Sequence, residues 1–178
     1  MPSSTPFRPP STLSSGTSSP PTFQAPPDDL FFGEWHMQRT SNSHWKDKKN
    51  VRMSYTPAHS DAFIAQSKKT SATTTISGSN MPVENETGVF AWQMKGLLRF
   101  IGAKWEILAW KASEDGRPAW MVTYAHKTIF TAAAVDVSCK PKGGISEVDM
   151  REIEGLLAGV QDAGFQKTVK EMFDVEQD

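Results

Sequence analysis

The fold is decided by four runs of sequence: GVFAWQM (88–94), AKWEILAWKA (103–112), PAWMVTYAHKT (118–128) and TAAAVDVSCK (131–140). Each run is short and rich in β-branched or aromatic residues, a composition typical of strands. Turn signals separate the runs, and Asp115-Gly116 is a dipeptide that favours a tight hairpin. We therefore predict four consecutive antiparallel strands in this part of the chain.

Residues upstream of these runs add further strands. In residues 30–39, Gly33, Trp35 and Met37 alternate onto one face. Strands are also predicted at 51–55, 62–66 and 70–77, and the polar loop before them should carry Trp45 back over one end of the fold. Several strands have apolar residues on both faces, which indicates a small closed barrel. The prediction is a mainly β fold: an antiparallel up-and-down barrel of about eight strands.

The two ends of the chain differ from this strand pattern. Residues 1–27 are rich in Pro, Ser and Thr and offer little to bury, so we predict a disordered tail followed by one domain at 28–178. After Gly143-Gly144, apolar residues such as Ile153 and Leu157 recur at helical spacing. One or two helices are expected at about 145–174, on the outside of the barrel or closing one end.

Composition excludes several classes of protein. The 178 residues carry a formal net charge of −1, so we expect no nucleic-acid partner, which would need a basic surface. The single cysteine excludes an internal disulfide, and the four histidines lack ligand spacing, so no metal is expected. No apolar run could span a bilayer, and the signal-peptide pattern is missing. These features predict a cytoplasmic protein.

The segment Phe32-Gly33-Glu34-Trp35 resembles the Gly-x-Trp signature of lipocalins and other calycins. The region 30–139 also resembles small fungal lipocalin-like proteins, most of which have no assigned activity. The similar phrases are WKDKKNVR (45–52), VTY (122–124) and KTIFT (127–131). The resemblance implies a cation over the ring of Trp35, and Lys140 or Lys142 would suit by chain order. It also implies an apolar small molecule held inside the barrel.

The aromatic residues of the strands are the candidate walls of a ligand site. Apolar walls with a few polar groups suit a small apolar ligand, which could be aromatic, terpenoid or polyketide-like. An inward-facing charge such as Arg52 would have to be paired or to meet the ligand. The predicted ligand-binding set is Trp35, Arg52, Tyr55, Trp92, Trp105, Trp110, Trp120, Tyr124 and His126, with no cofactor.

Two alternatives stay open at this point. Tyr124 and His126 share a strand face, so an inward Tyr124 would place His126 inward too. Together they could transfer protons in a cofactor-independent isomerase or cyclase that acts on a natural-product intermediate. Alternatively, the tryptophans simply fill the barrel, and the protein is a structural or interaction module.

Overall fold

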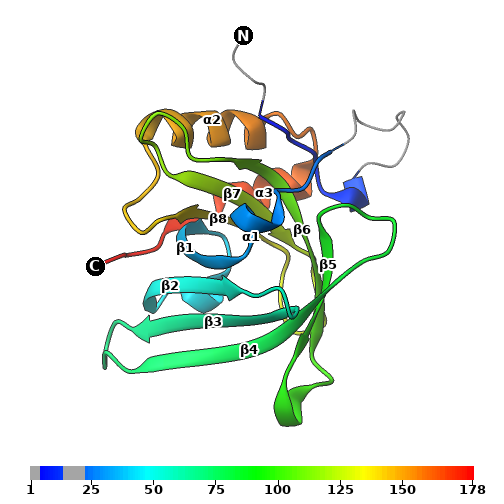
Figure 1. Ribbon diagram of the computed structural model, residues 1–178, viewed down its shortest axis with the longest axis vertical. Coiled ribbons are helices and arrows are strands. Elements are labelled where there is room, and N and C mark those ends of the chain that lie inside the picture. Colours follow the sequence, from blue (N-terminus) through cyan, green and yellow to red (C-terminus); the bar gives the residue numbers. More distant parts are fainter. Residues whose placement is uncertain (1–4, 14–22) are drawn as a thin grey trace.

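The computed structural model describes residues 5–13 and 23–178, and its centre is a closed antiparallel barrel (Figure 1). Each of eight strands pairs with the next along the chain, and β1 pairs with both β2 and β8, which closes the barrel. The predicted up-and-down barrel is therefore confirmed. The strands are β1 (Gly33–Thr40), β2 (Lys48–Tyr55), β3 (Ser60–Ser67), β4 (Thr73–Pro82), β5 (Val89–Met94), β6 (Gly102–Lys111), β7 (Ala119–Ala125) and β8 (Ala134–Lys140).

Three α-helices accompany the barrel. The short α1 (Asp28–Phe31) precedes β1, and α2 (Glu147–Ala158) and α3 (Ala163–Lys170) pack on the outer face of β6, β7 and β8 (Figure 1). Side chains cap both C-terminal helices: Ser146 accepts from the backbone N–H of Asp149, and Asp162 from that of Phe165. The predicted C-terminal helices are confirmed. A two-residue strand, β9 (Phe173–Asp174), then pairs with β1.

Strands β2 and β4 extend beyond the ranges predicted from the sequence. β2 begins at Lys48, inside the polar stretch expected to be a loop, because Lys48 pairs with Ser67 of β3. β4 continues to Pro82, because its polar second half pairs with β5, with Asn80 opposite Trp92. The start of β2 and the end of β4 are therefore set by hydrogen bonding to the neighbouring strands, and the strand propensity of their own residues does not set them.

The apolar residues form two layers, one inside the barrel and one outside it. The inner cluster includes the buried Trp35, Met53, Tyr55, Trp105 and Met121. The outer cluster lies between β6–β8 and the helices, and its buried members are Leu108, Ala109, Trp120, Val122, Val135, Val137, Cys139, Ile153, Leu157, Val160 and Phe165. Strands β6–β8 thus bury apolar residues on both faces, which explains why their alternation is weak in the sequence.

The two ends of the barrel are built differently. At the end where β1 begins, Lys140 Nζ lies 4.8 Å from the centre of the Trp35 ring and donates to the carbonyls of Leu30 (2.6 Å) and Phe32 (2.5 Å). Lys140 is therefore the cation that the resemblance implies. We call this the α1 end. At the other end, called the loop end, the buried Trp45 covers the interior, as predicted, and stacks on Phe63 at 6.0 Å.

Part of the predicted tail packs against the barrel. The backbone N–H of Arg8 donates to the carbonyl of Leu108 (2.9 Å), and Phe7 forms an isolated bridge with Ala109. The described residues 5–13 and 23–27 are thus attached to the domain, while 1–4 and 14–22 lie outside the described residues. A domain boundary at residue 28 stays a prediction.

Candidate functional site

The α1 end of the barrel contains an apolar pocket of about 480 Å³. Four parts of the chain surround it: the segment around α1, the turn between β2 and β3, the adjoining ends of β4 and β5, and Ile107 of β6. Its volume falls in the range of small-molecule sites. The lining residues are Ala25, Pro26, Asp28, Phe31, Phe32, Tyr55, Thr56, Pro57, His59, Ser60, Asn80, Pro82, Phe90 and Ile107.

A stack of aromatic rings forms the inner wall of this pocket. Phe31 lies 4.8 Å from Tyr55 and 5.4 Å from Phe90, centre to centre, and both pairs are stacked. Trp105 continues the stack at 4.6 Å from Phe90 and 5.6 Å from Tyr55. Rings held on three strands and one helix give a rigid apolar surface suited to a flat or ring-bearing ligand.

Two buried polar side chains lie beside this wall. Asn80 Oδ1 accepts from Trp105 Nε1 (2.7 Å), and Asp61 Oδ1 accepts from Trp92 Nε1 (2.9 Å). Both residues are buried, yet Asn80 Nδ2 and Asp61 Oδ2 have no hydrogen-bond partner among the described residues. Because an unpaired buried polar atom is costly, these atoms are suited to meet a polar group of a ligand or a water molecule.

The protonation of the pocket residues follows from their burial. Burial raises the pKa of Asp61. Hydrogen bonds from Trp92 and the backbone of Gly78, the nearby Asn80 amide and the charge of Lys95 partly oppose the rise. The Asn80 amide thus lowers the pKa of Asp61, although Asn80 Nδ2 has no hydrogen-bond partner among the described residues. Burial also raises the pKa of Tyr55, so its hydroxyl stays protonated at neutral pH.

Gly78 makes room for this arrangement. It lies opposite Asp61 in the β3–β4 pair, and the indole of Trp92 crosses directly over it. A Cβ at residue 78 would lie 2.1 Å from Trp92 Nε1 and 2.7 Å from Asp61 Oδ1. Glycine is therefore required here for close approach of a ring.

Five of the predicted ligand-binding aromatics belong to the inner cluster: Trp35, Tyr55, Trp92, Trp105 and Trp110. Of these, only Tyr55 lines the pocket itself. Trp105 supports the ring stack, and Trp92 holds Asp61. Trp35 packs under Lys140, and Trp110 donates to the carbonyl of Gln24 (2.7 Å). The structure therefore brings together the predicted set only in part.

Three members of the predicted ligand-binding set, Trp120, Tyr124 and His126, do not face the interior. These residues do share a face, but it is the outer face of β7. The Trp120 side chain is buried among the outer cluster, and Tyr124 lies 5.9 Å from Phe165 of α3, centre to centre. The inner face of β7 instead presents Met121. Because both faces of β7 are apolar, its sequence does not indicate which face points into the barrel.

His126 is part of a buried ion cluster outside the barrel. Its Nε2 lies 2.7 Å from Glu106 Oε1, which also accepts from the backbone and the hydroxyl of Ser11 (3.0 Å each). Arg8 Nη2 lies 3.5 Å from Glu106 Oε2. Burial would raise the pKa of Glu106, but the hydrogen bonds from His126 and Ser11 and the charge of Arg8 together lower it. Glu106 is therefore an ionised anchor for the N-terminal segment.

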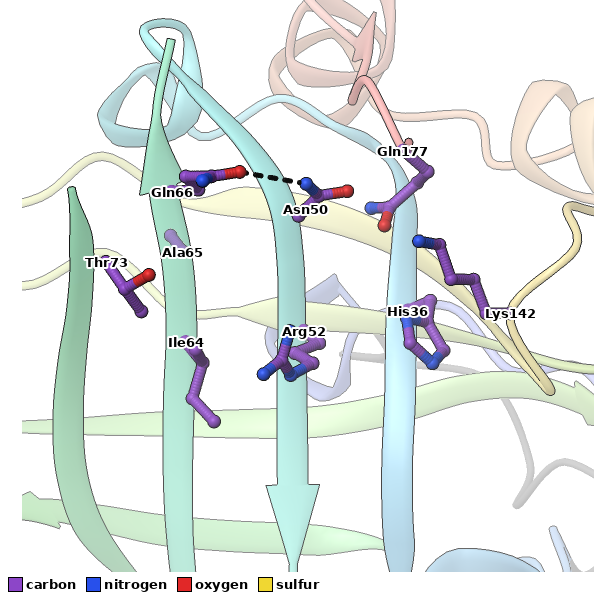
Figure 2. Close-up of a pocket in the computed structure, with 9 residues that line it drawn as sticks. All are labelled: His36, Asn50, Arg52, Ile64, Ala65, Gln66, Thr73, Lys142 and Gln177. Atoms are coloured by element: carbon purple, nitrogen blue, oxygen red, sulfur yellow. Dashed lines mark hydrogen bonds between the residues drawn. The ribbon is translucent and has the colours of Figure 1, made fainter. Parts of the chain in front are cut away.

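Arg52 also faces outward, in a second and more polar pocket of about 250 Å³ (Figure 2). It pairs with Glu34 (2.9 Å) outside the barrel, so it is not the inward-facing charge that was considered for the ligand site. In Figure 2 the side chains of His36, Arg52 and Lys142 lie on one side of this pocket. Asn50 donates to Gln66 (3.1 Å) across its upper part.

Of the residues that line the pocket, the sequence prediction included only Tyr55. Those it missed include Phe31, Asn80 and Phe90, and it also missed Asp61 beside the pocket. Phe31 and Phe90 lie in apolar segments and could have been found by extending the aromatic set. Asp61 and Asn80 stand in polar surroundings of the sequence, where solvent exposure is the usual outcome. Their burial depends on the pairing of β3 with β4 and of β4 with β5, so it could not be predicted from the neighbouring residues in the sequence.

The barrel and its flanking helices define the class of fold, which is that of the lipocalins and calycins. Solved structures with this fold include apocrustacyanin C1 (TM-score 0.61, 12% identity, 87% of this chain and 82% of that chain). Lobster apocrustacyanin A1 matches with a TM-score of 0.58 and 10% identity over 85% of this chain and 79% of that chain. The cockroach allergen Per a 4 matches with a TM-score of 0.62 and 11% identity over 90% of this chain and 94% of that chain. No protein-family profile and no curated sequence matches the chain. At this level of identity the likeness establishes the fold alone.

Two further findings concern the described residues only. Within 5–13 and 23–178, no helix is long and apolar enough to cross a membrane. Over the same residues, no group of three or more His, Cys, Asp or Glu side chains is arranged to hold a metal ion.

Proposed function

We propose that the protein binds an apolar small molecule in the pocket at the α1 end of the barrel. The observation that carries the proposal is the combination of a stacked aromatic wall with the unpartnered Nδ2 of Asn80. The wall would supply most of the binding free energy by removing apolar surface from water. The lipocalin-like fold of the solved neighbours supports the choice of the barrel as the binding site.

The pocket favours a ligand of a definite kind. Its stacked rings suit an aromatic, terpenoid or polyketide-like skeleton, and the free N–H of Asn80 suits a carbonyl or ether oxygen on that skeleton. The protonated Tyr55 hydroxyl is a second donor, because it has no hydrogen-bond partner among the described residues. The resemblance to fungal proteins and the cytoplasmic location are compatible with such a ligand and stay predictions.

Binding is favoured over the two alternatives. The cyclase hypothesis relied on Tyr124 and His126 inside the cavity, and both lie on the outer face of β7. The hypothesis of a filled barrel fits the stacked centre of the interior, but it leaves the pocket at the α1 end and its unpaired amide without a purpose.

The proposal is tested by calorimetric titration with 2-acetylnaphthalene and 2-ethylnaphthalene, two ligands that differ in one carbonyl. We expect both to bind, and the ketone to bind more tightly by about 1 kcal/mol, or roughly fivefold. Asn80→Leu should remove the preference for the ketone, and Phe90→Ala should weaken both ligands. Circular dichroism at the titration temperature establishes that each variant is folded.

Ile64→Ala is the matched control, because Ile64 lines the outer pocket of Figure 2. It should leave both affinities unchanged. Absence of binding by either ligand, or equal weakening by Ile64→Ala and Phe90→Ala, would contradict the assignment of the pocket.

A further inference from the structure

Exposed apolar side chains gather on two loops at the loop end of the barrel. Among the described residues, seven large hydrophobic side chains are exposed, and five of them lie in the loops 95–101 and 126–133. The three most exposed of these side chains are Leu97 (97% exposed), Ile129 (90%) and Phe100 (71%). Phe130 and Leu98 are also exposed. Such a concentration on a small protein marks an interaction site.

The two loops belong to neighbouring hairpins. Loop 95–101 joins β5 to β6, loop 126–133 joins β7 to β8, and β6 pairs with β7. The backbone N–H of His126 donates to the carbonyl of Lys104 (2.9 Å), so the second loop leaves the barrel beside the base of the first. In Figure 1 the β5–β6 hairpin projects from the barrel at this end.

Hydrogen bonds hold both loops in defined turns. The first loop contains the short 3-10 helix Gly96–Leu98. Directly after this helix, the N–H of Ile101 donates to the carbonyl of Leu98 (2.9 Å). In the second, the Thr128 hydroxyl accepts from the N–H groups of Phe130 and Thr131 (3.0 Å each). The apolar side chains are thus presented outward by structured turns.

Positive charge surrounds these apolar tips. The loops KGLLRFI (95–101) and HKTIFTAA (126–133) contain Lys95, Arg99 and Lys127 and no acidic residue. In the described part of the chain, none of these three cations forms an ion pair with a carboxylate, but Lys95 Nζ donates to the hydroxyl of Ser60 (2.7 Å) beside the pocket at the α1 end. Arg99 and Lys127 are therefore the cations that accompany the apolar tips. The other two loops of this end, 41–47 and 68–72, contain three lysines and one acidic residue. These are Lys46, Lys68 and Lys69, and Asp47.

The opposite end has the reverse sign. Helix α1 and the loops 56–59, 83–88 and 112–118 carry one cation, Arg117. Their acidic residues are Asp28, Asp29, Glu84, Glu86, Glu114 and Asp115. The loop residues of the two ends therefore differ in the sign of their formal charge.

We propose that the loop end docks on an anionic membrane surface, with Leu97, Phe100 and Ile129 inserted among the lipids. Apolar tips flanked by Lys and Arg match the boundary between headgroups and acyl chains, and the cations attract anionic lipids. A second copy of the chain fits less well, because a contact through this end would oppose cation to cation. Docking in this way leaves the pocket at the α1 end in water.

The test is flotation of the full chain with vesicles of phosphatidylcholine alone, or of phosphatidylcholine and phosphatidylserine in equal amounts. We expect binding to the mixed vesicles that weakens as salt is added, because salt screens the attraction. Leu97→Ser/Phe100→Ser and Arg99→Gln/Lys127→Gln should each lower the partition coefficient by about tenfold or more.

Met81→Ser is the matched control, because Met81 is exposed near the acidic end. It should leave vesicle binding unchanged. Failure to bind mixed vesicles, unchanged binding by both loop variants, or equal loss in the control would overturn the proposal. So would a dimer in sedimentation that the loop substitutions dissociate, since the face would then contact a second copy.

Discussion

The two ends of the barrel use the same kinds of residue in opposite ways. At the α1 end, aromatic side chains turn inward, and Lys140 is held by the ring of Trp35 and two carbonyls. At the loop end, apolar residues such as Leu97 turn outward, and lysines surround them. The α1 end therefore buries its aromatic residues and contains the pocket proposed to bind a ligand, whereas the loop end presents an exposed apolar surface.

The strongest test of this difference is Gly78→Ala beside the pocket. The new Cβ would clash with the Trp92 indole and with Asp61, so the ring and the strand must move. We expect a loss of about 3 kcal/mol in the free energy of unfolding, measured with urea. Gly155→Ala in α2 is the control, since a Cβ there meets open space, and it should stabilise by about 0.5–1 kcal/mol. Equal effects of the two substitutions would contradict the close approach at Gly78.

Lys140→Met tests the anchoring of α1. The substitution removes two charged hydrogen bonds to carbonyls and the contact with the Trp35 ring. Urea unfolding should show a loss of about 2 kcal/mol. The exposed Lys142 provides the comparison, and Lys142→Met should change stability by less than about 0.5 kcal/mol. A Lys140 variant as stable as this control would mean that the anchor is not needed.

Asp136 is a carboxyl inside the otherwise basic loop end, and its titration should be visible. Burial raises its pKa to about 6, although a hydrogen bond from the Thr40 hydroxyl (2.5 Å) partly opposes this. The folded state therefore holds the proton more tightly than the unfolded state. Stability should fall by about 1–2 kcal/mol as the pH rises from about 4 to about 6, allowing for partial exposure.

The check is urea unfolding of Asp136→Asn over the same pH range. The variant should lose most of this slope and should be more stable than the parent near neutral pH. Part of the slope should remain, because the raised pKa of Asp61 acts in the same direction. A slope equal to that of the parent would assign the titration to another group.

The smallest effect on folding is expected at the exposed loops. Leu97→Ser and Ile129→Ser remove side chains that pack against almost nothing, so each should change the unfolding free energy by less than about 0.5 kcal/mol. Thermal melts in the absence of lipid measure this. A loss comparable to that of Lys140→Met would show that the loop end also stabilises the barrel.

The barrel was predictable because its signals are local. Alternation in β1 places Trp35 and Met37 inside, the turn residues separate the later strands, and Lys140 falls at the correct place in chain order. The C-terminal helices follow from spacing of the same kind. The extension of β4 to Pro82 was not predictable, since its polar residues are held by β5.

The candidate site was only partly predictable, because its orientation is decided by distant contacts. Trp120 and Met121 are both apolar neighbours on β7, and α2 decides which of them is outside. Asn80 becomes a pocket residue, and Asp61 a buried residue beside the pocket, only once Trp105 and Trp92 lie over them. Tyr55 was identified because an aromatic residue in a short alternating strand faces the interior.

The buried Glu106 has a consequence for preparing the protein. Composition alone suggests starting an expression plasmid at residue 28, which would delete Arg8 and Ser11. Glu106 would then keep only His126 as a partner while losing its cover, and an ionised carboxyl next to the apolar faces of β6 and β7 would be opened to solvent. Shortened versions of the chain should therefore retain residues 5–13 if they are to behave like the 178-residue chain.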